Sequence, residues 1–348
     1  MHLSYMNVNA AFNDLVCKFH YSEIPITVAP SRNGDVIMAT QPMTITYLNP
    51  KQRVLFNEAR DCNPFFHLFE SLWILAGRDD VAPLKYFVST INEFSDTGFT
   101  FNGAYGQRLR YFHRIDQIKE AIAQLKHNPN SRRVVLQMWT LSDMMKADNR
   151  HGTMSKDVPC NTHAYVSINP LGLELTVCNR SNDMIWGMLG ANVVHFSFLQ
   201  EYLAACIGVP VNVYNQFTNN LHVYRSNWKP DEWLSDRTED LYSMPRVLRA
   251  VPLVKDVERF NYECAEFIDL KEDGVYQEPF LNDVAVWACL GYRHHKNREY
   301  PRALEAVSRI ESDDWRVACR RWLERRSVAW RKKNGDVERA ESCDNAEA

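Results

Sequence analysis

Apolar residues recur at helical spacing in several stretches of this chain. Residues 63–77, NPFFHLFESLWILAG, carry apolar side chains at that spacing and end at a glycine, which predicts a buried helix. Val193–Ile207 predicts a second long apolar helix, and residues 113–126 predict a helix on the surface. Residues 283–293 and 300–331 are also helical in pattern, with candidate helices at 301–311 and 313–329.

Shorter apolar runs bounded by turn residues predict strands. The clearest runs are Val134–Trp139, His163–Ile168, Leu173–Cys178 and Val211–Thr218. Residues 1–60 mix short apolar runs with turn residues such as those at 31–35, and they predict strands flanking a loop. The pattern contains no βαβ array, no GxGxxG motif and no P-loop, so it predicts an α+β fold.

This pattern divides the chain into three parts. We expect one catalytic domain over residues 1–250 and a helical extension over residues 251–331, packed on the core. Residues 332–348 are polar and are expected to be disordered.

Composition narrows the class of protein. The chain has 348 residues, 40 basic against 43 acidic, which argues against a general nucleic-acid binder. Its nine cysteines form no CxxC pair, so we expect neither a metal site nor a disulfide framework. We expect no secretory signal and no membrane span, which together favour a reducing cytoplasm.

One cysteine stands in a setting that suits chemistry. Cys160 lies in Asp157-Val158-Pro159-Cys160-Asn161, just ahead of a predicted strand, and Arg180 follows twenty residues later. An arginine beside a thiol favours the thiolate and can also hold a phosphate. Taken alone, the cysteine could equally be a small buried apolar residue.

The run DVPCNTHAYVSI…CNRSNDMIWGMLGANVVHFSFLQEYLAA…NLHVY resembles the core of the thymidylate synthase family. Upstream segments resemble further elements of that family in the same order, over about residues 12–230. These are Arg32 in Ser-Arg-Asn-Gly, the helix FESLWILAG from Phe69 to Gly77, Tyr105-Gly106-Gln107 and Ser131-Arg132-Arg133. The resemblance implies a thymidylate-synthase-like fold, a mixed β-sheet packed with long helices.

The resemblance also implies a reaction. Cys160 would add to carbon 6 of a pyrimidine nucleoside monophosphate, so that carbon 5 can take a one-carbon unit from 5,10-methylenetetrahydrofolate. Glu70 would transfer protons through ordered water, and Tyr105 would help to remove the carbon 5 proton. A homodimer is implied, with Arg132 and Arg133 reaching the partner's site, and neither nucleic acid nor membrane is expected as a partner.

The remaining implied roles concern binding. The nucleotide would be held by Arg32, Arg132, Arg133, Arg180, Ser181, Asn179, Asn192, His222 and Tyr224. The folate would meet Asp183, Asn92 and Trp73, although Asp183 could hold backbone instead. Asn192 would select uracil by donating to the carbonyl at position 4 and accepting from the N–H at position 3.

Each of these residues also has an ordinary structural alternative. Asn192 follows a turn that is one residue longer than the family's, so it could be a helix N-cap instead. Arg132 and Arg133 could form surface ion pairs. Tyr105 could be a packed aromatic, and His222 with Tyr224 a satisfied core pair.

Three departures from the family pattern bear on the product. Asn92 stands where a tryptophan would shield the reactive methylene, Asn161 follows the nucleophile in place of histidine, and helices replace the short apolar C-terminus. A wetter pocket favours quenching by water over hydride. The chain is therefore closest in character to the phage-type pyrimidine nucleotide 5-hydroxymethylases, enzymes of phages that modify their DNA, with deoxyuridylate preferred.

Alternatives to this activity stay open. They are a thymidylate synthase, a cytidylate hydroxymethylase, and an inactive nucleotide-binding homologue. The last predicted helix is basic, with arginines at 316, 320, 321, 325, 326 and 331. It could be an amphipathic helix packed on the core, or it could contact a partner or the folate glutamate tail.

Overall fold

Six strands form the central sheet of the computed structural model, which describes residues 1–148, 152 and 154–344. Their order is β1-β4-β9-β7-β6-β5, and the sheet is mixed, because β1 runs parallel to β4 and β7 parallel to β9. The strands are β1 His2–Tyr5, β4 Met43–Tyr47, β9 Val211–Thr218, β7 Gly172–Asn179, β6 Asn161–Asn169 and β5 Val135–Gln137. The predicted strands at 134–139, 163–168, 173–178 and 211–218 are thus confirmed.

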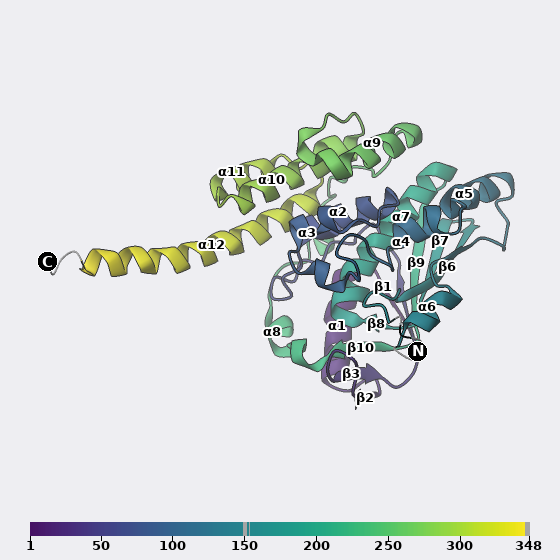
Figure 1. The fold of residues 1–348 in the computed structure, drawn as a ribbon, viewed down its shortest axis with the longest axis horizontal. Coiled ribbons are helices and arrows are strands. Elements are labelled where there is room, and N and C mark those ends of the chain that lie inside the picture. Colours follow the sequence, from purple (N-terminus) through teal and green to yellow (C-terminus); the bar gives the residue numbers. More distant parts are fainter. Residues whose placement is uncertain (149–151, 153, 345–348) are drawn as a thin grey trace.

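A second, smaller sheet lies at one end of the molecule (Figure 1). Its order is β2-β3-β10-β8, with strands β2 Ile26–Ala29, β3 Val36–Ala39, β10 Leu221–Tyr224 and β8 Asn182–Asp183. Because β8 and β10 follow directly after β7 and β9, the two sheets share a corner. That corner brings the loop between β2 and β3 close to the loop that enters β6.

Two buried helices cover one face of the central sheet. α7 (Asn192–Ile207) packs on β7 and β9, and α2 (Pro64–Leu75) packs on α7. α7 is apolar on nearly every face, as a helix enclosed on all sides must be. The side chain of Asn63 caps α2, and Gly77, with φ of +75°, turns the chain away after it. Both predicted helices are confirmed.

The prediction for residues 1–60 is wrong in one part. The structure has the strands and the loop, but α1 (Val8–His20) is a helix. Its buried side chains include Val8, Phe12, Leu15 and Phe19, a helical spacing that the polar residues between them obscured. The Asn7 side chain caps α1 by accepting from the backbone N–H groups of residues 9 and 10.

Shorter helices connect these layers. They are α3 Val81–Phe87, η1 Ile91–Phe94, α4 Tyr105–Gln107, η2 Arg108–Phe112, α5 Gln117–His127, α6 Leu141–Lys146, η4 Met184–Ala191, η5 Arg225–Asn227, α8 Pro230–Ser235 and η6 Leu241–Ser243. The predicted surface helix at 113–126 is α5, which begins four residues later than predicted, after its N-cap Asp116.

The C-terminal helices pack on α2. They are α9 Val257–Leu270, η7 Lys271–Asp273, η8 Leu281–Ala285, α10 Val286–Lys296, α11 Tyr300–Ser308 and α12 Asp313–Asp344. One apolar core runs without a break from Val8 to Leu323, so these helices share it. The division at residue 250 stays a prediction.

α12 departs from the prediction at its end. It continues as helix through Asp344, across residues that the sequence predicts to be disordered, and it extends away from the rest of the molecule (Figure 1). The segment continues the preceding helix, and its lysine, glutamate, arginine and alanine residues have high intrinsic helix propensity. Residues 345–348 lie outside the described part of the chain.

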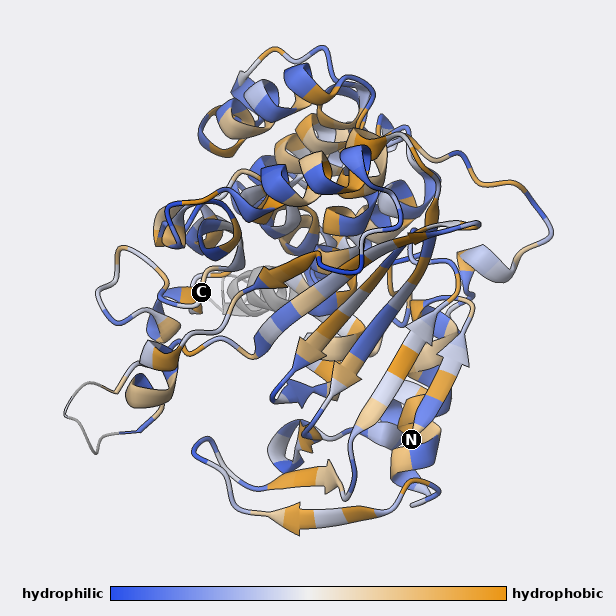
Figure 2. Cartoon of the chain, turned by 90° about the vertical axis from the view of Figure 1, so that its right-hand side faces the viewer, coloured by the Kyte–Doolittle hydropathy of each residue, from blue (hydrophilic) through white to orange (hydrophobic). Residues whose placement is uncertain are grey.

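The other face of the central sheet carries no helical layer in Figure 2. Side chains alternate along β6, where Ala164 and Val166 are buried and Tyr165 is half exposed. Val135 and Phe217 are likewise exposed on neighbouring strands. The described helices include none long and apolar enough to cross a membrane.

Candidate active site

A cleft of about 700 Å³ opens where the small sheet meets the loop before β6. Many of the predicted site residues line it together. They are Arg32, Cys160, Arg180, Ser181, Asp183, His222 and Tyr224. The cleft thus gathers a thiol, two guanidinium groups and a histidine from four separate segments of the sequence.

The nucleophile candidate is held at the floor of this cleft by an arginine. Arg180 donates from Nε to the Pro159 carbonyl (2.8 Å) and from Nη2 to the Val158 carbonyl (3.0 Å). Its Nη2 lies 3.9 Å from Cys160 Sγ. Because one guanidinium fixes the loop and faces the sulfur, the thiol and the positive charge keep a set geometry.

The protein's own charges do not yet favour the thiolate. Burial raises the pKa of the Cys160 thiol above its ordinary value, and Asp157 adds to that rise. The guanidinium groups of Arg180 and Arg32 act in the opposite direction. The thiol is therefore mostly protonated at neutral pH in this state of the protein.

The outer wall of the cleft offers donors to an anion. Arg32 lies in the exposed loop between β2 and β3 and donates to the Lys156 carbonyl (3.3 Å). Arg180 and Ser181 face it across the cleft. On the small sheet, His222 and Tyr224 stand edge to face with ring centres 5.4 Å apart, and both line the cleft.

A second, apolar pocket of about 180 Å³ adjoins the cleft, since Phe94 and Asp157 line both. Its walls are mostly flat or branched apolar side chains. These are Trp73, Ile74, Leu84, Ile91, Phe94 and Phe101. Such a pocket suits a fused aromatic ring system, so the residues present fit the pteridine of a folate.

Tyr105 lies where the pocket and the nucleophile meet. It lines the pocket, and its hydroxyl accepts from the backbone N–H of Asn161 (3.3 Å). Burial raises the pKa of Tyr105, and the nearby Cys160 adds to the effect. The phenol is thus a proton donor or relay beside the nucleophile, with no anionic form at neutral pH.

Glu70 faces the same pocket and has a partner that the sequence analysis did not name. Glu70 Oε2 lies 2.9 Å from His195 Nε2, at ion-pair distance but without hydrogen-bond alignment. The signal for His195 was present in the sequence, because it is an imidazole within the apolar run of α7.

A chain of buried amides reaches Asn192. Gln216 Nε2 donates to the Met188 carbonyl (3.0 Å), so its Oε1 accepts, here from Asn182 Nδ2 (3.3 Å). Asn182 Oδ1 accepts from Asn192 Nδ2 (3.0 Å), and Asn192 Oδ1 accepts from Asn161 Nδ2 (3.3 Å). A carbonyl can only accept, so the Met188 carbonyl fixes the orientation of every amide in the chain.

The extra residue before Asn192 is absorbed by a π-helical segment. η4 (Met184–Ala191) winds more widely than an α-helix, and α7 begins at Asn192. The N-cap position falls on Ala191, and the Asn192 side chain bonds to amides instead. The capping alternative for Asn192 is therefore wrong.

Asp183 supports the start of η4. Its carboxylate accepts from the N–H groups of Ile185 (2.8 Å) and Trp186 (2.6 Å), while the residue also lines the cleft. Of its two predicted contacts, the backbone one is present. Burial raises the pKa of Asp183.

Other predicted residues lie apart from the cleft. The Asn179 amide donates to the Phe217 carbonyl within the sheet, and the side chain is buried. Asn92 lies on η1 but lines neither cavity, which leaves Ile91 and Phe94 to form that wall. Arg132 and Arg133 border a separate surface hollow. The binding roles of all four stay predictions.

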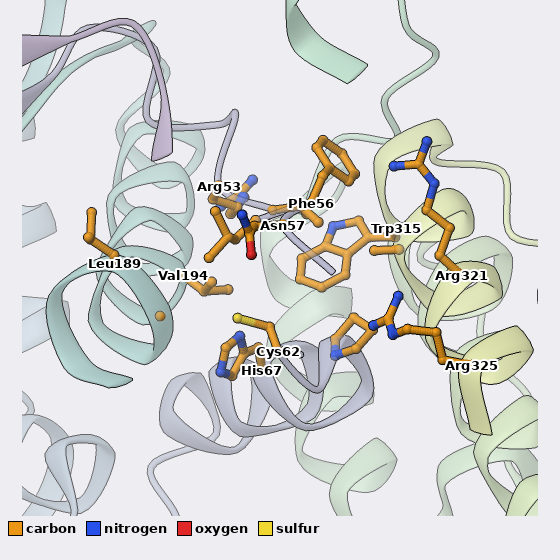
Figure 3. A pocket seen from close by; sticks show the side chains of 15 residues that line it. Arg53, Phe56, Asn57, Cys62, His67, Leu189, Val194, Trp315, Arg321 and Arg325 are labelled. Carbon is orange, nitrogen blue, oxygen red and sulfur yellow. The ribbon is translucent and has the colours of Figure 1, made fainter. Parts of the chain in front are cut away.

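A third cavity, of about 30 Å³, lies between α2, α7 and α12 (Figure 3). His67 and Cys62 line one side of it, with Trp315 and Arg325 across from them. It holds water-sized groups at most. Among the described residues, no group of three or more histidine, cysteine or acidic side chains could hold a metal ion.

The comparisons with known proteins agree with this geometry. The thymidylate synthase family model matches residues 58–277, and the chain belongs to that family. It is 40% identical to the deoxyuridylate hydroxymethyltransferase of Pseudomonas phage M6, over 86% of this chain and 88% of that protein. The predicted family is confirmed.

More distant relatives carry two different names. The chain is 36% identical to the deoxyuridylate hydroxymethyltransferase of Bacillus phage SP01, over 68% of this chain and 64% of that protein. It is 27% identical to the thymidylate synthase of Symbiobacterium thermophilum, over 58% of this chain and 72% of that protein. The structure of thymidylate synthase from T4 phage superposes with a TM-score of 0.54 at 18% identity, covering 74% of this chain and 90% of that one, which confirms the predicted fold.

Proposed function

We propose that this protein is a deoxyuridylate 5-hydroxymethyltransferase that uses 5,10-methylenetetrahydrofolate and a covalent adduct on Cys160. The observation that carries the proposal is the pairing of a half-buried thiol with two arginines in one cleft, directly beside an apolar pocket. The names of the phage relatives agree with this one-carbon transfer and with this substrate.

The nucleotide's phosphate binds on the outer wall of the cleft. Arg32, Arg180 and Ser181 bind the phosphate by charge and by forked hydrogen bonds. Cys160 Sγ then adds to carbon 6, and its proton leaves the buried site. Carbon 5 becomes enolate-like and able to bond to a one-carbon unit, which the folate supplies when it is bound in the apolar pocket.

Asn192 selects uracil over cytosine. Its Nδ2 donates one proton to Asn182 and has a second for the carbonyl at position 4, while Oδ1 accepts from Asn161 and has a lone pair for the N–H at position 3. Cytosine has the opposite donor and acceptor pattern at these two atoms. The fixed amide chain keeps Asn192 from turning over to accept it.

His222 and Tyr224 bind the sugar hydroxyl. Both line the cleft, and Asn220 Oδ1 accepts from His222 Nδ1 (3.1 Å), which orients the ring. Asn179 and Asn92 remain assigned to the nucleotide and the folate, although neither lines the cleft or the apolar pocket.

The enzyme acts as a homodimer. The uncovered sheet face exposes Val135, Tyr165 and Phe217 among polar side chains such as Glu174 and Asn215, a mixed surface of the kind that protein interfaces bury. Arg132 and Arg133 lie just before β5 at the edge of that sheet, exposed and away from their own cleft. Pairing of two such faces carries these arginines toward the partner's phosphate site. The free thiols of the described residues fit a reducing, cytoplasmic setting.

Product analysis tests the proposal. The purified protein is incubated with deoxyuridylate and methylenetetrahydrofolate, and the nucleotide is analysed by mass spectrometry. We expect a product heavier by CH2O. A product heavier by CH2 alone would make the protein a thymidylate synthase, and deoxycytidylate as the preferred substrate would overturn the assignment of Asn192.

A further inference from the structure

A buried pair of titratable groups faces the apolar pocket from two helices. Glu70 on α2 and His195 on α7 both line the pocket, and their Oε2 and Nε2 atoms lie 2.9 Å apart. The His195 side chain is 5% exposed and the Glu70 side chain 17%. Neither ring nitrogen of His195 has an aligned hydrogen-bond partner.

Such a pair is costly unless it has a use. A buried polar atom without a partner loses its hydration and gains nothing in return. The residues beside it on α7, Val193, Val194 and Phe196, are buried and apolar, so a leucine at position 195 would pack without that cost. The imidazole is thus a poor choice for stability alone, which indicates a chemical role.

The charges around the pair leave Glu70 as the main counter-charge. His67, one helical turn earlier on α2, has its pKa lowered to about 3 by burial and by His195 and Arg60, so it is neutral at working pH. Arg60 is engaged by the Ile185 carbonyl and by the Trp186 ring. Tyr105 and Asp157 also line the pocket, and the pKa of each is raised by burial.

We propose that His195 and Glu70 together remove the proton from the water that completes the reaction. The inference rests on the proposed function and assigns its last step to named atoms. Glu70 contacts the water and accepts its proton. His195 positions Glu70 and shares that proton with it.

With Cys160 bonded to carbon 6 and a methylene group on carbon 5, the water oxygen bonds to the methylene carbon. Its O–H bond breaks, and the proton passes to the Glu70–His195 pair. The methylene π electrons move to the oxygen at position 4, and their return restores the carbon 5–carbon 6 double bond and expels the Cys160 thiolate. The thiolate takes the stored proton.

The proposal assigns two steps of the reaction to different residues. Loss of the carbon 5 proton belongs to the Tyr105 side of the site, beside Cys160, whereas water addition belongs to the pair in the pocket. The His195→Gln variant keeps a similar volume and a donor but cannot store a proton. The matched control is His67→Gln, which changes a histidine that is already neutral.

The first experiment follows one turnover with deoxyuridylate tritiated at carbon 5. For His195→Gln we expect tritium release within about threefold of the wild-type rate and hydroxymethyl formation slower by about a hundredfold, the usual value of a general base. An added thiol should then capture the waiting methylene as a thioether. Equal loss of both steps, or no loss in either, overturns the proposal.

The second experiment needs no folate and no turnover. In the deoxyuridylate complex, NMR of 15N-histidine protein should contain an imidazole N–H signal protected from exchange, lost in His195→Gln and in Glu70→Ala but kept in His67→Gln. A signal that survives Glu70→Ala overturns the pair. If the wild-type protein forms only the methylated nucleotide, the proposed function is wrong. The N–H signal tests the Glu70–His195 pair independently of that result.

Discussion

The reactive sulfur of Cys160 lies in a setting that opposes its ionisation. Burial and Asp157 raise the pKa of the Cys160 thiol, and two arginines only partly offset them. A protected, protonated thiol resists oxidation and stray alkylation.

The rate at which iodoacetamide alkylates Cys160 in the free enzyme should depend on pH according to the raised pKa of this thiol. Only the thiolate reacts, so a raised pKa means that the rate still climbs with pH above about 8.5, where an ordinary thiol levels off. Arg180→Ala removes a charge that lowers the pKa, so it should slow alkylation further at pH 8. Labelling of Cys160, followed by peptide mass spectrometry, measures the rate, and a plateau below the ordinary range would contradict this.

Replacement of the nucleophile gives the sharpest residue test. Cys160→Ser should abolish tritium release from deoxyuridylate, because an alcohol is not acidic enough to add to carbon 6. The matched control is Cys17→Ser, which changes a half-buried thiol on α1, far along the chain from the cleft. Full turnover by Cys160→Ser would remove the basis of the whole proposal.

The amide chain permits a test of base selection at a residue that touches no ligand. Asn182→Ala leaves Gln216 Oε1 and Asn192 Nδ2 without their partners. Loss of a buried hydrogen bond costs about 1–3 kcal/mol, so kcat/KM for deoxyuridylate should fall about tenfold. Discrimination against deoxycytidylate should narrow as Asn192 gains freedom to turn. Unchanged discrimination in competition assays would mean that Asn192 is oriented without the chain.

At the scale of elements, α12 joins the C-terminal helices to the catalytic core. Trp315, Cys319, Trp322 and Leu323 are buried in the common core. Arg325 and Arg326 pair with Asp61, just before α2. Since α2 carries Glu70, the C-terminal helices support the segment that holds a catalytic candidate.

Trp322→Ala should test that support. The indole packs against Phe65 on α2 and against Tyr292, and its side chain is nearly buried. Removing such a side chain costs about 3–5 kcal/mol, which urea unfolding would measure. Trp330→Ala, which removes a more exposed indole resting on Tyr300, should cost about 1 kcal/mol. Equal costs would indicate that α12 is not anchored through Trp322.

The sequence predicted elements well where the signal was local. The strands around Cys160 and the two long helices follow from alternation and helical spacing within their own residues. α1 was missed because polar residues interrupt its apolar face. The reach of α12 was missed because polarity suggested disorder although the residues favour helix.

The order of the sequence motifs predicted which residues form the site, but not how their side chains contact one another. Cys160, Arg180, Ser181, His222 and Tyr224 do gather in one cleft. The His195–Glu70 contact depends on how α7 crosses α2, and the orientation of Asn192 depends on a π-helical turn and a distant carbonyl. Such relations between distant segments are set by packing and leave no local pattern.

At the scale of the whole molecule, one hypothesis, a homodimer, accounts for both the uncovered face of the central sheet and the position of Arg132 and Arg133 outside the cleft. The face exposes Val135, Tyr165 and Phe217, and large apolar side chains gathered on one surface often mark an interaction site. Arg132 and Arg133 are exposed near the edge of this face, and neither reaches the cleft of its own chain. A twofold dimer resolves both facts, since it buries the face and brings each arginine pair to a partner.

Subunit mixing tests this directly. Cys160→Ser should be inactive because it lacks the nucleophile, and Arg133→Ala should be weak because it lacks a phosphate contact. In a mixed dimer, one of the two clefts has an intact Cys160 from one chain and an intact Arg133 from the other, so mixing after partial unfolding and refolding should restore activity. Mixing Cys160→Ser with Arg180→Ala provides the contrast. Arg180 serves the cleft of its own chain, so that mixture leaves each cleft with one defect and should stay inactive. Sedimentation should give a dimer for every variant. A monomer, or no restored activity in either mixture, would place all the arginines of a cleft on a single chain.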